Sequence, residues 1–265
     1  MERAIIVSAS SDIGYALGQQ WLDRGREVYG TYRTASPQVD ELQARGSRLV
    51  LCDLASRSST LEACETLRAA CPSWDILAVC AGLQEPICPF LDVEFGAWET
   101  SVMVNFVSQL RVVRELLPTR RREATREPTV LLFAGGGPNK ATVNYSAYAV
   151  SKVALVKMCE LLDAEIHDTC FVIVNPGWVK TKGHTAMLAA GARAGTDYQR
   201  VAERFAQGPW TSMERVIDCC EWIIQSPREL VGGRYFGVEF DDWESERLAE
   251  RLAQDPQLCK LRRRE

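Results

Sequence analysis

The segment AIIVSASSDIGYALG, residues 4–18, joins a short apolar run to a turn of small residues and then to a helical pattern. Such a run predicts a buried strand, and the helix that follows begins with N–H groups that have no partner within the helix. This arrangement is an anion site, because the free N–H groups and the helix dipole both favour negative charge. The small residues that let the backbone approach a phosphate are Ser8, Ala9, Ser10 and Ser11. Gly14 allows close helix packing, and the simpler alternative is a polar turn in which Asp12 caps the helix.

Short apolar runs alternate with helical patterns along the rest of the chain. Strands are predicted at 4–9, 27–32, 47–53, 75–80, 129–133, 170–175 and 234–240. Hydrophobicity is continuous rather than alternating at 76–79 and 130–133, which is typical of parallel strands covered on both faces. With right-handed crossovers, the sequence predicts one Rossmann-type α/β domain over residues 1–265: a doubly wound parallel sheet of about seven strands with helices on both faces.

Composition excludes several classes of protein. The 265 residues are 46% hydrophobic and 25% charged, with a net charge of -4, so we expect a soluble globule without a basic field for nucleic acid. The ten cysteines show no C-x-x-C spacing and there are two histidines, so we expect no metal site. The first apolar run is too short for a signal peptide, and no run reaches the roughly 20 residues of a membrane span. We therefore expect a cytoplasmic protein that does not enter a membrane.

Tyr148 and Lys152 are separated by four residues in the segment YAVSK, within a predicted helix over 146–165. Residues i and i+4 share one face of a helix, so the phenol and the ammonium lie close together. A free tyrosine has a pKa of about 10, and an adjacent ammonium favours the phenolate, which makes the phenol a usable acid or base near neutrality. The alternative is a solvated pair without function.

These features occur in an order that resembles the short-chain dehydrogenases/reductases over nearly the whole chain. The matching positions are the first turn, Asp53, Ala81-Gly82, Asn105, Tyr148, Lys152 and Pro176-Gly177. The first turn of that family reads T-G-x-x-x-G-x-G. In this chain Val7 and Ser8 stand for the first pair, Asp12 stands for the middle glycine, and Gly14 matches the last. A serine at position 8 costs little where its φ is negative.

The resemblance implies a nicotinamide dinucleotide cofactor. Asp53 resembles the family acid that accepts a hydrogen bond from adenine, although an acid at a helix start is the plainer alternative. Cys80 stands where the family has an asparagine, and we expect it to act as a small hydrophobe. The expected cofactor-binding residues are Ser8, Ser10, Ser11, Asp12, Ile13, Gly14, Arg33, Asp53, Leu54, Ala81, Gly82, Tyr148, Lys152, Pro176, Gly177, Val179 and Thr181.

The end of the second predicted strand indicates which cofactor is bound. An acid there would bind the adenosine ribose, whereas a base would bind a 2′-phosphate. The segment Gly30-Thr31-Tyr32-Arg33-Thr34 has no acid. Arg33 can stack on adenine and fork onto a phosphate, so we expect NADP(H) to be favoured over NAD(H). The alternative is an arginine that is simply exposed.

The resemblance also assigns catalytic roles. Tyr148 exchanges the substrate proton, Lys152 binds the nicotinamide ribose and lowers the pKa of Tyr148, and Asn105 holds a water in a proton relay. A buried structural role is the alternative for Asn105. The fourth catalytic member of the family is a serine, and the corresponding position in this chain is Gly135.

The loss of a side-chain donor at such a site typically costs about 2–4 kcal/mol of transition-state stabilisation. Three replacements are open: N–H groups of the run at 135–137, a substrate that orients itself, or a loop side chain. The loop candidates are Thr142, Asn144 and Ser146. The glycine run also widens the floor of the site, which favours a bulky polar substrate such as a sugar derivative.

We therefore predict an NAD(P)(H)-dependent oxidoreductase that moves hydride between nicotinamide and a carbonyl or secondary alcohol. The alternatives are an epimerase or dehydratase of the same family that keeps its cofactor, and a silent cofactor-binding sensor or scaffold. Residues 182–212 are predicted to be a mobile excursion that shapes the substrate pocket, and residues 241–265 are a C-terminal extension.

The predicted helices at 101–117 and 146–165 have apolar residues on more than one side. Extra apolar faces indicate a partner. In the family that the chain resembles, these two helices form a contact between subunits, so we expect a homodimer or a homotetramer. The alternative is that both helices pack only on the sheet.

Overall fold

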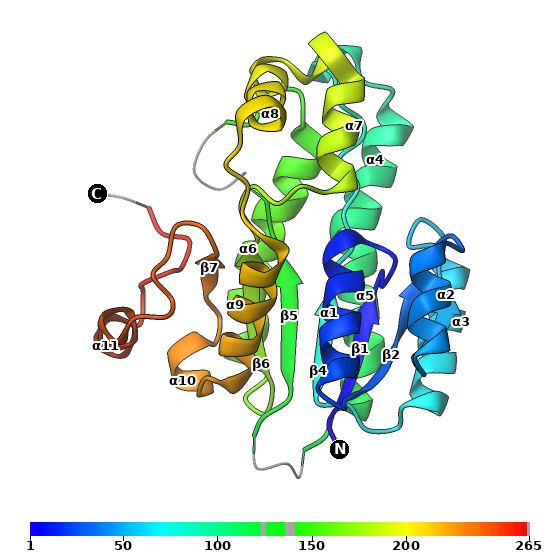
Figure 1. Ribbon diagram of the computed structural model, residues 1–265, viewed down its shortest axis with the longest axis vertical. Helices are drawn as coiled ribbons and strands as arrows, with labels where there is room; N and C mark the ends of the chain where they lie inside the picture. Colours follow the sequence, from blue (N-terminus) through cyan, green and yellow to red (C-terminus); the bar gives the residue numbers. More distant parts are fainter. Residues whose placement is uncertain (123–125, 136–140, 264–265) are drawn as a thin grey trace.

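The computed structural model describes residues 1–122, 126–135 and 141–263, and it contains one seven-stranded sheet (Figure 1). The strands are all parallel in the order β3-β2-β1-β4-β5-β6-β7. Their bounds are β1 Arg3–Val7, β2 Glu27–Tyr32, β3 Arg48–Leu51, β4 Ile76–Val79, β5 Thr129–Phe133, β6 Cys170–Asn175 and β7 Tyr235–Gly237. The predicted Rossmann-type sheet is therefore confirmed.

Helices connect the strands and cover both faces of the sheet. Their bounds are α1 Asp12–Asp23, α2 Pro37–Ala44, α3 Arg57–Ala70, α4 Phe95–Val102, α5 Ser108–Leu116, α6 Ser146–Glu165, α7 Lys182–Ala190, α8 Thr196–Gln207, α9 Met213–Gln225, α10 Arg228–Val231 and α11 Glu246–Gln254. None of the described helices is both long and apolar enough to cross a membrane.

Two hydrophobic cores explain the continuous apolar runs of the strands. Alternate residues of β1 enter different cores, with Ile6 on the side of α1, α2 and α9, and Ile5 on the side of α3, α5 and α6. Residues 4–7 of β1 are all buried because successive side chains point to opposite faces, and both faces are covered. The sheet is consequently the middle layer of three, and its carboxyl ends all open on one edge.

The helix predicted at 101–117 is interrupted. Helix α4 ends at Val102, a π-helical turn covers Met103–Val107, and α5 begins at Ser108. A π turn inserts an extra residue into the helix and often marks a functional position. The turn contains the buried Asn105, so the polar residue is accommodated by a change in helical geometry. By contrast, α6 covers the predicted 146–165.

Residues 182–212 contain the two helices α7 and α8, which lie beyond the carboxyl ends of the strands (Figure 1). They have a small core of their own, made of Ile87, Tyr145, Met187, Ala190, Ala194 and Val201. The excursion is therefore a helical cap over the edge of the sheet where Rossmann-type folds bind ligands. Its mobility stays a prediction.

The segment after β7 docks on the edge of the sheet. The Tyr235 N–H donates to the Cys259 carbonyl at 2.7 Å, which pairs the tail with the outer side of β7. The buried Arg234 donates to the carbonyls of Leu252, Asp255 and Leu258 at 2.7–3.1 Å. Arg262 forms an ion pair with Glu160 of α6, and this pair lowers the pKa of Glu160 to about 2. The described part of the extension is thus held by backbone acceptors and an ion pair.

Candidate active site

Tyr148 and Lys152 lie in the first two turns of α6. The Lys152 side chain is only 2% exposed, and its Nζ donates to the carbonyls of Phe133 at 2.9 Å and Ala81 at 3.2 Å. The same Nζ lies 5.8 Å from the centre of the Tyr148 ring. The pair is therefore not a solvated surface pair, because the lysine is anchored to the ends of β4 and β5.

The ionisation of the pair differs from the expectation. Tyr148 is half-buried, and the desolvation of its phenol, with a smaller contribution from Tyr235, raises the pKa of Tyr148 to about 12. Burial lowers the pKa of Lys152 to about 8. The predicted lowering of the tyrosine pKa is wrong for the protein without cofactor, because desolvation of the phenolate outweighs the attraction of the ammonium. At neutral pH the phenol is protonated and the lysine is mainly charged.

Gly135 follows β5 and lies directly against Tyr148. A Cβ added to Gly135 would lie 2.6 Å from the Tyr148 Oη and 3.0 Å from its Cε1. The phenol therefore occupies the space that a side chain at position 135 would need. Gly136 and Gly137 lie outside the described residues, so the proposed backbone donors of this run stay a prediction.

The three loop side chains that were candidates for the missing donor differ in their bonding. The Asn144 amide donates to the Arg193 carbonyl at 2.8 Å, and the Ser146 Oγ accepts from the Trp98 indole at 3.0 Å. The Thr142 Oγ1 is buried and has no hydrogen-bond partner among the described residues. Since a buried hydroxyl without a partner is costly, Thr142 is the loop residue best suited to meet a polar group of a ligand.

The Asn105 side chain is fully buried and bonded on both sides. Its Oδ1 accepts from the Leu83 N–H at 2.8 Å, and its Nδ2 donates to the Leu83 carbonyl at 2.7 Å and to Ser101 Oγ at 3.1 Å. These bonds fix the loop that follows Ala81 and Gly82. A relay through Asn105 would therefore use its main-chain carbonyl, because the side chain is committed.

The first turn adopts an unexpected backbone conformation. Ser8 has a φ of 64°, in the left-handed region, so the condition under which a serine costs little there, a negative φ, is not met. The turn keeps the shape that a glycine would take, with the Ser11 N–H bonded to the Ser8 carbonyl at 3.0 Å. A left-handed non-glycine residue costs roughly 1–2 kcal/mol. The Ser8 N–H donates to Thr31 Oγ1 at 3.0 Å, which helps to hold this conformation.

The helix that starts after the turn is capped by a serine. Ser11 is the N-cap, and its Oγ accepts from the Gly14 N–H at 3.1 Å. A Cβ on Gly14 would lie 2.4 Å from the Ser8 carbonyl oxygen, so this glycine is required for close packing. Asp12 opens the helix, and Ile13 packs partly buried against the core. Asp12 therefore does not provide the cap that was the simpler alternative.

The remaining dinucleotide-binding candidates surround the same edge of the sheet. Arg33 is exposed directly after β2, and Leu54 is buried after β3. The exposed Asp53 accepts the Ala55 N–H at 3.0 Å, so one carboxylate oxygen stabilises its own turn. A Cβ on Gly82 would meet nothing within 4 Å, which leaves open space beside β4. A capped helix start, open backbone and an exposed base fit a dinucleotide phosphate and its ribose.

The segment after β6 reaches from the sheet to α7. Gly177, after Pro176, has a φ of 75°, and its N–H donates to Asn175 Oδ1 at 3.2 Å. Val179 is buried, and Thr181 Oγ1 lies 3.1 Å from His184 Nδ1. His184 also packs against the rings of Trp178 and Trp210, and burial lowers its pKa.

Two contacts of this segment had no signal in the sequence. The Lys182 N–H donates to Asp12 Oδ2 at 2.7 Å, and its Nζ donates to the Ser10 carbonyl at 3.2 Å. They connect the start of α7 with the first turn. A contact between residues 170 positions apart produces no local pattern, so sequence reasoning missed both Lys182 and His184.

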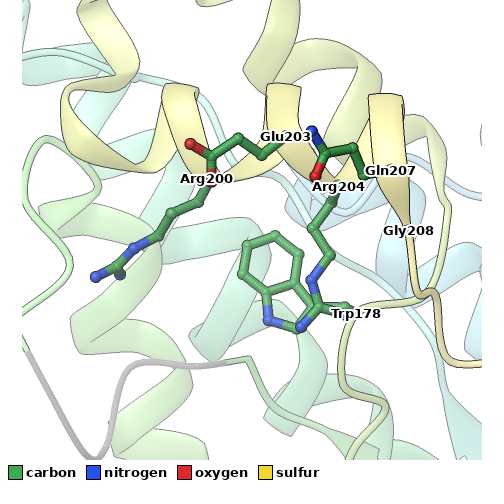
Figure 2. Close-up of a pocket in the computed structure, with 6 residues that line it drawn as sticks. All are labelled: Trp178, Arg200, Glu203, Arg204, Gln207 and Gly208. Atoms are coloured by element: carbon green, nitrogen blue, oxygen red, sulfur yellow. The ribbon is translucent and has the colours of Figure 1, made fainter.

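A cavity of about 370 Å³ lies between α8 and the segment after β6. Figure 2 shows the Trp178 indole and the Arg204 side chain lying together beneath α8. The Arg204 guanidinium is 5.0 Å from the centre of the Trp178 ring. The lining residues are Trp178, Arg200, Glu203, Arg204, Gln207 and Gly208. The described residues include no cluster of three or more acidic, histidine or cysteine side chains that could hold a metal ion.

Comparison with known proteins gives a family and a set of relatives. A family model described as short chain dehydrogenase matches residues 2–190. A serine 3-dehydrogenase from Rhizobium radiobacter is 25% identical over 233 residues, which cover 85% of this chain and 89% of that protein. The residues matched by the family model include the first turn, α6 and the segment after β6 as far as residue 190.

Solved structures share the fold. A short-chain dehydrogenase/reductase from Saccharomyces cerevisiae superimposes with a TM-score of 0.79 and 19% identity, covering 94% of this chain and 99% of that chain. A complex of RhlG from Pseudomonas aeruginosa with NADP has a TM-score of 0.75 and 20% identity, covering 89% of this chain and 94% of that chain. At these identities the likeness establishes the architecture.

Proposed function

The chain belongs to the short-chain dehydrogenase family and is an NAD(P)-dependent oxidoreductase, and we propose that it moves hydride between nicotinamide and the carbonyl or secondary alcohol of a polar substrate such as a sugar derivative. The observation that carries this proposal is the Tyr148–Lys152 pair at the carboxyl end of the sheet, with the lysine anchored to two main-chain carbonyls. The cofactor, when bound, supplies or accepts the hydride.

Tyr148 is the proton donor in the direction of carbonyl reduction. Its raised pKa keeps the phenol protonated at neutral pH, so the proton is available when the substrate oxygen gains negative charge. The phenolate that forms is stabilised by the Lys152 ammonium, which the carbonyls of Phe133 and Ala81 hold nearby. Asn105 fixes the loop after β4 through its side chain, and we assign the proton relay to its main-chain carbonyl.

We propose that Gly135 stands in place of the family serine and that Thr142 supplies the hydroxyl that orients the substrate carbonyl. This assignment rests on the buried Thr142 Oγ1, which has no partner among the described residues. Thr142→Val, which keeps the shape and removes the hydroxyl, should lower kcat by about a hundredfold. Thr142→Ser should retain most of the activity, and full activity in Thr142→Val would contradict the assignment.

We propose that NADPH is preferred over NADH, because Arg33 lies exposed after β2 and the compared Pseudomonas aeruginosa relative is a complex with NADP. Arg33→Met should weaken NADPH binding by about tenfold and leave NADH binding nearly unchanged. Tighter binding of NADH than of NADPH by the unaltered protein would refute the preference while leaving the hydride-transfer proposal intact.

The decisive experiment has two stages. Fluorescence titration with NADPH and NADH measures cofactor binding, and absorbance of the reduced cofactor then follows turnover with ketones, keto sugars and nucleotide sugars. Tyr148→Phe should bind cofactor normally and lose about 10²- to 10⁴-fold in kcat. Failure to bind either cofactor would refute the proposed function, and undiminished turnover in Tyr148→Phe would refute the role of the phenol. Net oxidation or reduction also distinguishes this function from an epimerase, a dehydratase or a silent sensor, which no comparison favours.

We also propose a homodimer or homotetramer that forms through α5 and α6. Val113 and Val156, on these helices, are buried against the sheet, as expected if both helices only cover it. Apolar side chains elsewhere on these segments are exposed: Met103 before α5 by 37%, and Val150 and Leu161 on α6 by 50% and 42%. Light scattering of the intact protein and of Val150→Glu tests this interface, and a monomer at micromolar concentration would contradict it.

All ten cysteines are free thiols, which suits a reducing compartment. We keep the cytoplasm as the proposed location, and fractionation of cells that express the tagged full chain tests it.

A further inference from the structure

Lys182 lies where three loops of the sheet edge meet. It is the first residue of α7, and it bonds to the turn after β1 through Asp12 and Ser10. Its neighbour Gly183 packs on the loop after β4, since a Cβ on Gly183 would lie 3.0 Å from Gln84 Nε2. The start of α7 therefore spans the space between the dinucleotide turn and the open backbone at Gly82.

The charges around the turn explain why a cation is useful there. Asp12 opens helix α1, so its carboxylate lies at the helix start where a pyrophosphate would bind. Two negative groups at one helix start repel each other, and the repulsion is stronger where protein shields the pair from water. Lys182 can offset both negative charges. Its main-chain N–H donates to the Asp12 carboxylate, and its ammonium lies 3.2 Å from the Ser10 carbonyl, within the turn where the pyrophosphate would bind.

The present partner of the ammonium is weaker than the one that a cofactor offers. A main-chain carbonyl is a neutral acceptor, whereas a phosphate oxygen is charged and forms shorter and stronger hydrogen bonds with an ammonium. An ammonium has three N–H donors and rotates freely, so it can bond a phosphate that enters the turn. The main-chain bond from Lys182 to Asp12 of α1 is kept when the ammonium does so. The exposed Lys182 stem allows this movement.

We propose that Lys182 is a ligand of the cofactor pyrophosphate, and that its contacts with the turn make bound cofactor stabilise the start of α7. The inference rests on the proposed nicotinamide-dependent function. Val179 and Thr181, assigned above to the cofactor, precede Lys182 in the same segment. A single stretch of chain thus reaches from the nicotinamide end to the phosphates, and its last residue begins α7.

Lys180 provides a matched control. Its Nζ lies 5.3 Å from the centre of the Phe205 ring on α8, so it carries the same charge in the same segment without touching the turn. Lys182→Met should weaken NADPH binding by about tenfold or more, the effect of one charge-assisted hydrogen bond, and should flatten its dependence on salt. Lys180→Met should bind NADPH as the unaltered protein does.

A ligand series locates the contact. The affinity of 2′-phospho-ADP-ribose, which has the pyrophosphate but no nicotinamide, should fall in Lys182→Met by the same factor as that of NADPH. Adenosine 2′-monophosphate lacks the pyrophosphate and should bind both proteins equally. Equal NADPH affinity in Lys182→Met and the unaltered protein, or an equal loss for adenosine 2′-monophosphate, would overturn the assignment. If the unaltered protein binds neither NADPH nor NADH, the proposed function fails instead.

Hydrogen exchange tests the coupling without any turnover. NADPH at saturating concentration should protect the amides of α7, residues 182–190, in the unaltered protein and in Lys180→Met. Lys182→Met, saturated with the higher concentration that it requires, should show clearly less protection of α7 and unchanged protection of α1. Identical protection of α7 in both variants would show that Lys182 does not couple the cap to the cofactor.

Discussion

The first turn and the segment after β5 differ in how they accommodate an unusual residue. The resemblance to the family leads us to expect a glycine at position 8, where the chain has Ser8, and a serine at position 135, where it has Gly135. The turn keeps its shape, and Ser8 takes a left-handed backbone to do so. At the other site the Tyr148 phenol occupies the space beside Gly135. The residue at position 8 is accommodated by local backbone strain, whereas the glycine at position 135 alters the surroundings of Tyr148, the side chain that we propose to be catalytic.

This difference has a physical cause. The turn is held by main-chain bonds, such as that from the Ser11 N–H to the Ser8 carbonyl, which any residue can form. A side-chain substitution in this turn therefore changes the stability of the fold more than it changes the backbone conformation of the turn. Next to Tyr148 the geometry is set by side-chain packing, so a missing Cβ moves the neighbour that fills its place. The four variants that follow test this contrast, beginning with the largest expected effect.

Gly135→Ser should lower activity, even though it adds the hydroxyl that the family uses. Its Cβ would lie 2.6 Å from the Tyr148 Oη, so the phenol must move away, and a displacement of about 1 Å costs about a hundredfold in kcat. Steady-state kinetics with Gly135→Ala as the matched variant measures the effect, and NADPH affinity should remain unchanged. A rise in kcat for Gly135→Ser would show that the site lacks only a hydrogen-bond donor, and that Tyr148 can make room for the added side chain without losing its position.

Gly14→Ala should destabilise the fold by about 3 kcal/mol, at the upper end for overpacking, because the added Cβ meets main-chain atoms that cannot rotate away. The nearest are the Ser8 carbonyl oxygen at 2.4 Å and the Ala9 Cα at 3.1 Å. Urea unfolding of the intact protein measures the change. Gly25→Ala is the control for backbone strain without overpacking. Gly25 is exposed, a Cβ there would meet nothing within 4 Å, and any loss of stability would come from its φ of 75° alone. An unchanged free energy of unfolding for Gly14→Ala would mean that the turn is less rigid than its main-chain bonds imply.

Lys152→Met should stabilise the protein by on the order of 2 kcal/mol at pH 7 and abolish turnover. The pKa of Lys152 is about 8 in the folded protein, below the ordinary value of 10.5. Between about pH 8 and pH 10.5 the lysine is therefore protonated in the unfolded chain but neutral in the folded protein. The free energy of unfolding of the unaltered protein consequently rises with pH over this range. The advantage of Lys152→Met should be largest below pH 8 and should shrink toward pH 10.5. Unfolding at pH 7 and pH 10 measures it, and a constant difference would contradict the lowered pKa.

Ser8→Gly should have the smallest effect, a stabilisation of about 0.5–1 kcal/mol. A glycine adopts the φ of 64° without strain, although it also gives the unfolded chain more freedom. Thermal unfolding measures the gain, and Ser8→Ala is the control that keeps the strain and should not stabilise. A loss of stability in Ser8→Gly would show that the serine side chain has a bond that offsets its backbone cost.

Much of the fold was predictable because it depends on local patterns. The bounds of β2, β5, β6 and α6 agree with the predicted ranges, since buried strands and long helices have strong hydrophobic periodicity. Strand β1 ends at Val7 instead of residue 9, because Ser8 turns into the left-handed region, a conformation that sequence patterns assign to glycine. The break at Met103–Val107 was missed for a similar reason: it accommodates Asn105, whose partner Leu83 is distant in the sequence.

The sequence by itself determined the parallel sheet, the strand-turn-helix at the start of α1 and the shared face of Tyr148 and Lys152, because periodicity and spacing of a few residues suffice for each. Only the tertiary structure decided what surrounds them. It placed the phenol against Gly135, bonded the Asn105 side chain to the loop after β4, and brought Lys182 to Asp12. Those contacts depend on how loops from separate crossovers meet at one edge of the sheet, and no local pattern encodes such a meeting.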